Sequence, residues 1–170
     1  MTTAAASAGL GAWPQWPDGM EPGVCPLFVR NQGMIAAPPE RVWRWLVRAD
    51  LWPTWFAGAS NVRFEAGGPE LAVGARVVWR MLGATIRVTV RRAEAPRFLD
   101  WEGGAAGVHA YHAWLLEPAD GGTRIVTEET ERGPLPWLAR WYLRRALHGA
   151  HESWVASLAR VAPPADPPAR

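Results

Sequence analysis

Apolar residues recur at every second position through a long central region of this sequence. The alternation is clearest in the segment 76–91, where Val, Trp, Met and Ile residues alternate mostly with Arg and Thr. A period of two is typical of strands that have one face in the core and the other in water. We therefore expect the region 61–131 to form a meander of about six antiparallel strands.

The first clear hairpin of this region turns at residues 82–85, which read Leu-Gly-Ala-Thr. If that turn is tight, Met81 faces Ile86 and Trp79 faces Val88 across the two strands. These side chains then share one apolar face of the sheet, and Arg and Thr side chains occupy the other.

The last hairpin of the region places two polar residues opposite each other. A connection at residues 119–122 sets the apolar residues Leu116 and Ile125 opposite each other, which marks their face as the inner one. In the same register His112 lies opposite Glu129, also on the inner face. An imidazole beside a carboxylate could orient a ligand hydroxyl or carbonyl group, or move a proton. The alternative is a structural pair that holds the two strands in register.

Helical patterns flank the strand region on both sides. A strand predicted at 27–36 is followed by a helix that begins at Pro38 and by a short helix or turn at 51–56. A long helix is predicted at 134–161, where apolar residues form one stripe. Because this helix is the element available to cover the apolar face of the meander, the predicted fold is α+β, a curved antiparallel sheet wrapped around a long C-terminal helix. A cavity remains wherever the lining side chains do not fill the space between them.

Length and composition fit one domain. The chain has 170 residues and a net charge of +2, and its Arg residues are scattered, which argues against nucleic-acid binding. No apolar run reaches the ~18 residues needed to cross a bilayer, so we expect no integral membrane segment. Cys25 is the single cysteine, and a cytoplasmic location is expected. We expect a partly disordered N-terminal extension at 1–26, a ligand-binding domain at 27–161 and a flexible Pro-rich tail at 162–170.

Several short motifs carry a resemblance to a known family. They are Ala37-Pro38-Pro39-Glu40-Arg41-Val42-Trp43, the pair Trp52 and Trp55, Pro96-Arg97-Phe98-Leu99-Asp100-Trp101 with Gly103, His112-Ala113-Trp114-Leu115-Leu116-Glu117-Pro118, and Gly121-Gly122-Thr123 leading to Thr127-Glu128-Glu129-Thr130 and Gly133. Over residues 27–161 the chain resembles the helix-grip START/Bet v 1-like (SRPBCC) superfamily, and within it the bacterial polyketide cyclase/dehydrase-like proteins. The resemblance implies a hydrophobic ligand held between sheet and helix. It is specific for the fold and not for the function, because members include cyclases, lipid carriers and sensors.

Aromatic and apolar residues of the inner faces are the predicted ligand contacts. Trp side chains on the inner sheet face could stack against a flat ligand, and aromatic residues at the start of the long helix could form the mouth of the cavity. The predicted ligand-binding residues are Trp79, Met81, Val88, Trp101, Trp114, Thr127, Trp137, Trp141, Tyr142, Leu147 and His151. The predicted catalytic pair is His112 and Glu129.

The sequence predicts no metal and no cofactor. His148 and His151 lie three residues apart on the long helix, a spacing compatible with metal binding, and His112 with Glu129 would complete such a site. However, His148 falls with Arg144 and Glu152 on a polar face, and no HExxH-like motif accompanies it. The sequence also lacks a P-loop, a GxGxxG loop and a GxSxG elbow.

Two functions fit these features. The first is a binding module that holds a hydrophobic, aromatic, polyketide-like or lipid-like small molecule. The second is an enzyme of the cyclase, aromatase or dehydratase kind, in which His112 and Glu129 act as acid and base on a polyketide-like substrate. Arg140, Arg144 and Arg145 form a short basic patch that could attract an anionic ligand or an acyl-carrier protein, and a homodimer is the other partner considered. The position of His112 and Glu129 relative to the cavity discriminates between the two functions.

Overall fold

A computed structural model describes residues 14–168 of the chain and has the predicted α+β architecture. Its seven-stranded sheet is antiparallel throughout and has the order β1-β7-β6-β5-β4-β3-β2. The strands are β1 (Leu27–Ile35), β2 (Ser60–Ala66), β3 (Arg76–Met81), β4 (Ala84–Glu94), β5 (Phe98–Ala105), β6 (Val108–Ala119) and β7 (Gly122–Arg132). The helices are α1 (Pro39–Val47), the 3₁₀ turn η1 (Ala49–Leu51), α2 (Trp52–Trp55), α3 (Pro134–Leu138) and α4 (Arg140–Val161).

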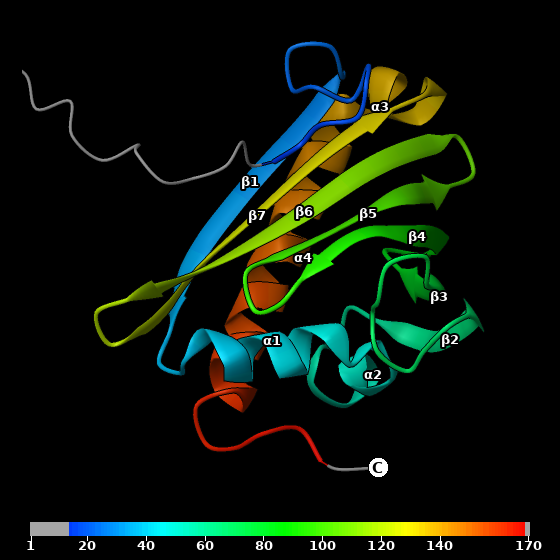
Figure 1. Ribbon diagram of the computed structural model, residues 1–170. Coiled ribbons are helices and arrows are strands. Elements are labelled where there is room, and N and C mark those ends of the chain that lie inside the picture. Colours follow the sequence, from blue (N-terminus) through cyan, green and yellow to red (C-terminus); the bar gives the residue numbers. More distant parts are fainter. Residues whose placement is uncertain (1–13, 169–170) are drawn as a thin grey trace, which may run out of the picture.

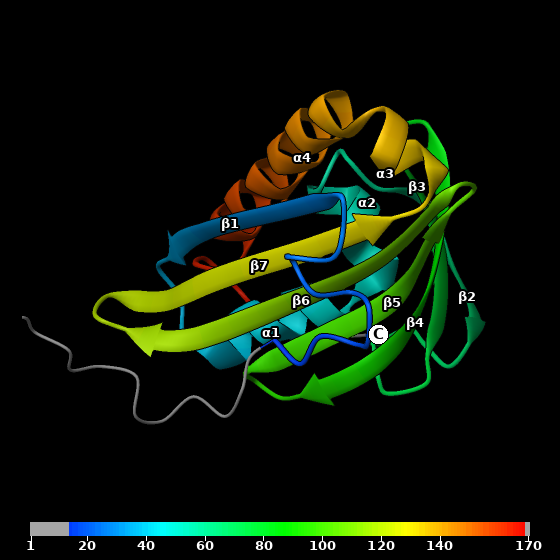
Figure 2. The same ribbon diagram turned by 90° about the horizontal axis from the view of Figure 1, so that it is seen from above.

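The curved sheet wraps around α4, which crosses its concave side (Figures 1 and 2). Helices α1 and α2 cover one end of the sheet, near the C-terminal end of α4 (Figure 1). Helix α3 lies at the opposite end, where α4 begins (Figure 1). The sheet and α4 therefore form two layers around one core, as a helix with one apolar stripe requires.

The core between the layers depends on a stripe of α4 that follows helical spacing. Leu147, His151, Trp154 and Leu158 are each buried, and they recur three or four positions apart on one side of the helix. Three of these four residues are apolar, and burying each such side chain stabilises the fold by about 1.5–3 kcal/mol. His151 is the exception, because it brings a titratable group into the core.

The predicted long helix is interrupted at Ala139, which has φ −117° and ψ 24° and separates α3 from α4. The backbone N–H of Leu135 donates to the carbonyl of Gly107, at 3.3 Å, and so ties α3 to the β5–β6 turn. This contact directs α3 across the end of the sheet instead of along the axis of α4.

The register predicted for the β6–β7 hairpin is confirmed, since Leu116 lies opposite Ile125 and His112 lies opposite Glu129. The register predicted for the β3–β4 hairpin is wrong by two residues. Trp79 pairs with Ile86 and not with Val88, and Met81 pairs with Ala84 and not with Ile86. The cause is the length of the turn, which has two residues instead of four. A shift of two residues keeps each side chain on the predicted face.

The β3–β4 turn consists of Leu82 and Gly83 alone, at φ values of 51° and 80°. Positive φ at both central residues is the pattern of the two-residue type I′ turn, whose twist matches that of paired strands. A two-residue turn brings the start of β4 two residues closer to Met81 than the four-residue turn expected from the sequence, which shifts every partner on β4 by two.

The described parts of both termini contact the domain. Met20 is fully buried and accepts a hydrogen bond from the Thr130 hydroxyl, while Trp16 meets Tyr111 edge-on with 5.2 Å between ring centroids. At the other end, the Trp45 indole N–H donates to the carbonyl of Ala165. The predicted disorder of the first thirteen residues lies outside the described residues, and the predicted domain boundaries stay predictions. Among residues 14–168 no helix is long and apolar enough to span a membrane.

Candidate ligand cavity

A cavity of about 250 Å³ lies between the inner face of the sheet and α4. It exists because small residues leave space on strands β4 to β6, namely Ala84, Gly104, Ala105 and Ala110. The large side chains of its wall are apolar and include Trp79, Met81, Ile86, Val88, Trp101, Leu143, Leu147 and Trp154. Two further lining residues are exposed, Leu82 by 59% and Leu135 by 45%, so the cavity reaches the surface at these residues.

One part of the wall is polar and belongs to three titratable side chains. His112 of β6 and Glu129 and Glu131 of β7 line the cavity. Glu129 and Glu131 are two positions apart on one strand, so they face the same side of the sheet. The pairing of His112 with Glu129 brings His112 Nδ1 within 3.1 Å of Glu129 Oε2.

A second imidazole, from α4, joins this group. His151 Nε2 lies 3.0 Å from Glu129 Oε2, and the His151 ring stacks on the His112 ring with 4.5 Å between centroids. The Thr127 hydroxyl lies within hydrogen-bond distance of His112 Nε2. We call His112, Thr127, Glu129, Glu131 and His151 the polar cluster.

The hydrogen bonds fix the tautomers of both imidazoles. When Glu129 is ionised, its Oε2 accepts from His112 Nδ1–H and from His151 Nε2–H, because a carboxylate has only acceptors to offer. The Thr127 hydroxyl then donates to the unprotonated His112 Nε2. His151 Nδ1 carries no proton in this arrangement and has no hydrogen-bond partner among the described residues.

Burial keeps both imidazoles neutral. Loss of solvation lowers the pKa of His151 to about 3. The pKa of His112 lies well below its usual value, mainly because of burial and secondarily because of the neighbouring His151. A neutral imidazole retains one donor and one acceptor, which is what the cluster uses.

The two carboxyl groups respond in the opposite direction. Burial raises the pKa of Glu129 to about 8, while a hydrogen bond with Glu131 favours its ionised form. Burial also raises the pKa of Glu131 to about 8, and the charge of Glu129 and the same hydrogen bond raise it further. Of the two, Glu129 is therefore the group that ionises first as the pH rises, because its carboxylate accepts the hydrogen bond that protonated Glu131 donates.

The cluster offers two kinds of chemistry. Glu131 and Glu129 provide a proton donor and a proton acceptor at the wall of an apolar cavity, where either could bind a polar ligand atom or transfer a proton. In addition, one ligand atom each from His112, Glu129 and His151 lies within 4.8 Å of the others, so these residues could hold a divalent metal ion. The side chain of His148 is 48% exposed and lies 3.6 Å from Glu152, away from this group. The prediction that the protein has no metal stays a prediction.

Comparison with known proteins identifies the family. Residues 29–163 match the family described as "Polyketide cyclase / dehydrase and lipid transport". The chain belongs to this family. No curated protein matches the sequence.

Solved structures with the same fold share little sequence with this family member. A hypothetical protein of Helicobacter pylori superposes with a TM-score of 0.82 at 23% identity, covering 92% of this chain and 99% of that one. The di-domain ARO/CYC protein StfQ of the steffimycin biosynthetic pathway gives a TM-score of 0.67 at 16% identity, covering 80% of this chain and 50% of StfQ. Ara h 8.0201 gives 0.59 at 15% identity, covering 78% and 97%. These similarities establish the Bet v 1-like fold.

In this polyketide cyclase/dehydrase family member, the predicted site residues fall into three groups. The cavity wall includes seven of them: Trp79, Met81, Val88, Trp101, His112, Glu129 and Leu147. Trp114, Thr127 and His151 are fully buried and are absent from the cavity wall among the described residues. Trp114 packs behind the wall, 5.3 Å from the Trp154 ring. Their predicted role as ligand contacts stays a prediction.

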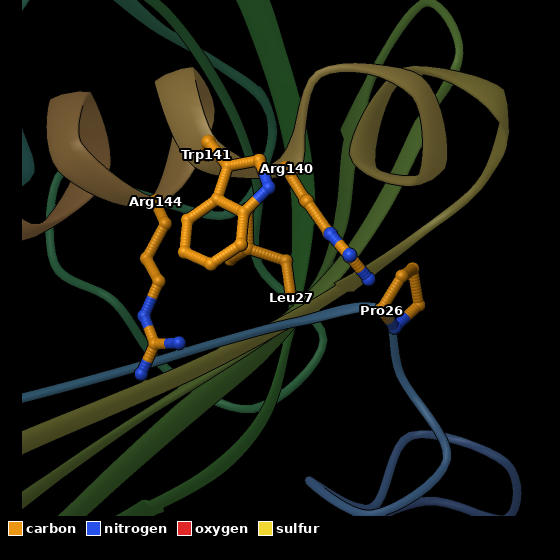
Figure 3. A pocket seen from close by; sticks show the side chains of 5 residues that line it. All are labelled: Pro26, Leu27, Arg140, Trp141 and Arg144. Carbon is orange, nitrogen blue, oxygen red and sulfur yellow. The ribbon is translucent and has the colours of Figure 1, made fainter.

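The third group lies on the outer surface. Trp137, Trp141 and Tyr142 are 72%, 76% and 75% exposed, and the structure does not bring them to the cavity wall. Figure 3 shows Trp141 beside a separate surface hollow of about 260 Å³, which is also lined by Pro26, Leu27, Arg140 and Arg144. Leu135 of α3 and Leu143 of α4 line the cavity. Trp137, Trp141 and Tyr142 lie one or two positions from these residues, so they project from other sides of the two helices.

Glu131 is the functional candidate that the sequence analysis missed. The sequence does indicate this residue. Glu131 follows Glu129 by two residues in a strand, so both side chains lie on the same face of the sheet. Trp154 lines the cavity as well and was not among the predicted ligand contacts. Its position three residues after His151 places both on the buried stripe of α4.

Proposed function

We propose that this protein binds a small hydrophobic molecule with an aromatic, polyketide-like or lipid-like skeleton in the cavity between the sheet and α4. The observation that carries the proposal is an apolar cavity with indole walls that ends at a polar cluster. Trp79, Trp101 and Trp154 offer flat apolar surfaces, and aromatic rings stack well on such surfaces. The family description, which names polyketide chemistry and lipid transport, supports the same ligand class.

The polar cluster gives the ligand a preferred direction. A ligand hydroxyl or carbonyl group can meet Glu131 or Glu129 at the cavity wall, whereas a purely hydrocarbon ligand offers these carboxyl groups no polar contact. Leaving buried polar groups without their partners costs about 1–3 kcal/mol, so a hydroxylated ring should bind more tightly than its hydrocarbon parent.

Calorimetric titration with 2-naphthol and naphthalene tests this proposal. The Ala110→Leu variant fills space at the cavity wall and should weaken binding of both compounds at least about tenfold. Ala119→Leu adds the same bulk at the exposed end of the same strand and should leave binding unchanged. Absence of binding by either compound, or equal binding by Ala110→Leu and the parent, would overturn the proposal.

A second candidate function is acid–base catalysis on a polyketide-like substrate, and the hydrogen-bonded pair of carboxyl groups at the cavity wall favours it. In a dehydration, Glu129 would accept a proton from the carbon beside a carbonyl while Glu131 donates its proton to the leaving hydroxyl. The C–H and C–O bonds break, a C=C bond forms and water leaves. His112 and His151 would hold Glu129 in place through their hydrogen bonds.

Turnover of a β-hydroxy carbonyl compound, followed by NMR, tests this second function. Glu131→Gln and Glu129→Gln should each abolish turnover, while Glu131→Gln still binds 2-naphthol. If the parent protein binds but shows no turnover that depends on Glu131, the binding function stands and the catalytic one does not.

A further inference from the structure

An exposed apolar surface lies where α3 ends and α4 begins. Trp137, Leu138, Trp141 and Tyr142 are between 72% and 76% exposed, and Leu135 is 45% exposed. We call these five residues the aromatic patch. Trp137 and Leu138 end α3, and Trp141 and Tyr142 are in the first turn of α4, so these four residues belong to one short segment around Ala139. Soluble proteins seldom expose large aromatic side chains in such a group unless the surface binds a partner.

The charge of this segment is entirely positive. Arg140, Arg144 and Arg145 lie among the aromatic residues, and residues 132–151 contain no Asp or Glu. None of the three Arg side chains belongs to an ion pair within residues 14–168. Arg140 lies over the Trp141 ring at 5.4 Å, and Figure 3 shows Arg140 and Arg144 on either side of Trp141. The patch therefore combines apolar contact area with uncompensated positive charge.

The patch adjoins the opening of the cavity. Leu135 belongs to both, and Leu143, one turn beyond Ala139, lines the cavity wall. Leu82 reaches the same opening from the β3–β4 turn, where it is 59% exposed. Its φ of 51° would be adopted more easily by Asn or Gly, so turn geometry does not explain why a leucine is exposed here.

We propose that the aromatic patch docks this protein on the surface of an anionic lipid bilayer, with the opening of the cavity against the membrane. Trp and Tyr rings favour the headgroup level of a bilayer, and Leu side chains favour the acyl boundary just below it. The Arg side chains attract anionic headgroups within a short screening distance. A bilayer satisfies the apolar and the cationic parts of the patch at the same time.

Two other possible partners fit the aromatic patch less well. A second copy of the chain, joined through the same patch on both copies, would bring Arg side chains against Arg side chains without an acidic residue between them. An acidic carrier protein would satisfy the Arg side chains, but the exposed indoles and leucines would also need an apolar surface. The proposal does not depend on the cavity function, since the patch and its charge are observed independently of any ligand.

Vesicle flotation tests the docking surface. The protein should float with vesicles of equal parts phosphatidylcholine and phosphatidylglycerol, and should stay unbound with phosphatidylcholine alone. Arg144→Gln should lower the partition coefficient about fivefold, and a double Trp137→Ala, Trp141→Ala variant at least about tenfold. Matched controls are Arg76→Gln, at the end of β3 remote from Leu82, and Val73→Ala, which change exposed side chains and should have no effect.

The outcomes separate the alternatives. Failure to bind anionic vesicles, or equal binding by the double Trp variant, overturns the proposal. Self-association of the parent that disappears in the double variant would identify a second copy as the occupant, and binding to an acyl-carrier protein but not to vesicles would identify an acidic protein. Circular dichroism confirms that each variant is folded, which is expected because the changed side chains are exposed. If the protein binds vesicles but neither 2-naphthol nor naphthalene, the docking proposal stands and the proposed ligand class is wrong.

Discussion

Glu131 makes the stability of this protein depend on pH above neutrality. The carboxyl groups of Glu131 and Glu129 have pKa values of about 8 in the folded protein, against a usual value of 4.5. Between these values the folded state holds more protons than the unfolded state, so the free energy of unfolding falls as pH rises. Each carboxyl group contributes at most about 1.4 kcal/mol per pH unit.

His151 and His112 act in the opposite direction at lower pH. The pKa of His151 is lowered to about 3 from 6.5, so between these values the folded state holds fewer protons and stability rises with pH. From pH 4.5 to 6.5 the two imidazoles and the two carboxyl groups oppose each other. The polar cluster therefore gives a plateau of stability in that interval and a decline on either side.

Urea denaturation from pH 5 to pH 9 measures this profile. The parent should lose stability above about pH 6.5, and Glu131→Gln, which keeps a hydrogen-bonding side chain without the titration, should show a shallower decline. Glu65→Gln, at an exposed carboxyl group on β2, is the control and should leave the profile unchanged. An identical decline in the parent and in Glu131→Gln would contradict the assignment.

Thr127 supports His112 without contacting the cavity. Thr127→Val keeps the shape of the side chain but removes the hydroxyl that donates to His112 Nε2. Because His112 is only 3% exposed, water cannot replace that donor, and we expect a loss of about 1–3 kcal/mol in the free energy of unfolding. Thr89→Val, on the exposed face of β4, should change stability by less than about 0.5 kcal/mol. If Thr127→Val left the free energy of unfolding unchanged, His112 Nε2 would need no hydrogen-bond partner.

The polar cluster shows how far the sequence predicts individual contacts. The pairing of His112 with Glu129 follows from strand register, which the sequence specifies through Leu116 and Ile125. The contact of His151 with Glu129 depends on how α4 packs against the sheet. The periodicity of apolar residues within one helix or strand does not predict which residues of two packed elements meet. A polar residue on an otherwise apolar helical stripe was the available signal.

At the scale of the elements, the β3–β4 turn is a site where stability could be gained. Leu82 at φ 51° adopts a conformation that costs ordinary residues roughly 1–2 kcal/mol and that Asn tolerates. Leu82→Asn should therefore raise the free energy of unfolding by about 1 kcal/mol. Leu82→Ala removes the same apolar surface without relieving the backbone, so it should give little change. Equal effects of the two substitutions in chemical denaturation would disprove the explanation from backbone strain.

The two hairpins explain why one register was predicted correctly and the other was not. The β6–β7 turn contains Asp120-Gly121, whose residue types favour a tight turn, and an apolar pair fixes the ladder beside it. The β3–β4 turn contains Leu82-Gly83, and leucine gives no sign of a left-handed conformation. Ala139 is similar, because alanine is the best helix former and its sequence context does not predict a break.

At the scale of the whole molecule, the C-terminal segment lies against α1, at the end of the molecule opposite α3 (Figure 1). Asp166 pairs with Arg44, and the carbonyl of Ala165 accepts from the Trp45 indole. Deleting residues 163–170 also removes two part-buried hydrogen bonds, from Arg41 to the Pro163 carbonyl and from Arg48 to the Pro168 carbonyl, so the free energy of unfolding should fall by about 1–3 kcal/mol. Binding of 2-naphthol should be unchanged in the same variant. A large loss of affinity on deletion would show that α1 and the cavity are coupled through the core.

The indole side chains of the core have a consequence for light absorption. The rings of Trp52, Trp79, Trp101, Trp114 and Trp154 form a continuous group in which neighbouring centroids are 4.9–6.4 Å apart. At such separations the transition dipoles of neighbouring indoles interact, so we expect coupled absorption and transfer of excitation energy between the rings. Circular dichroism in the aromatic bands should show exciton splitting, and one quencher in the cavity should dim emission from rings that it does not touch. Trp fluorescence should therefore change when a ligand occupies the cavity beside Trp101.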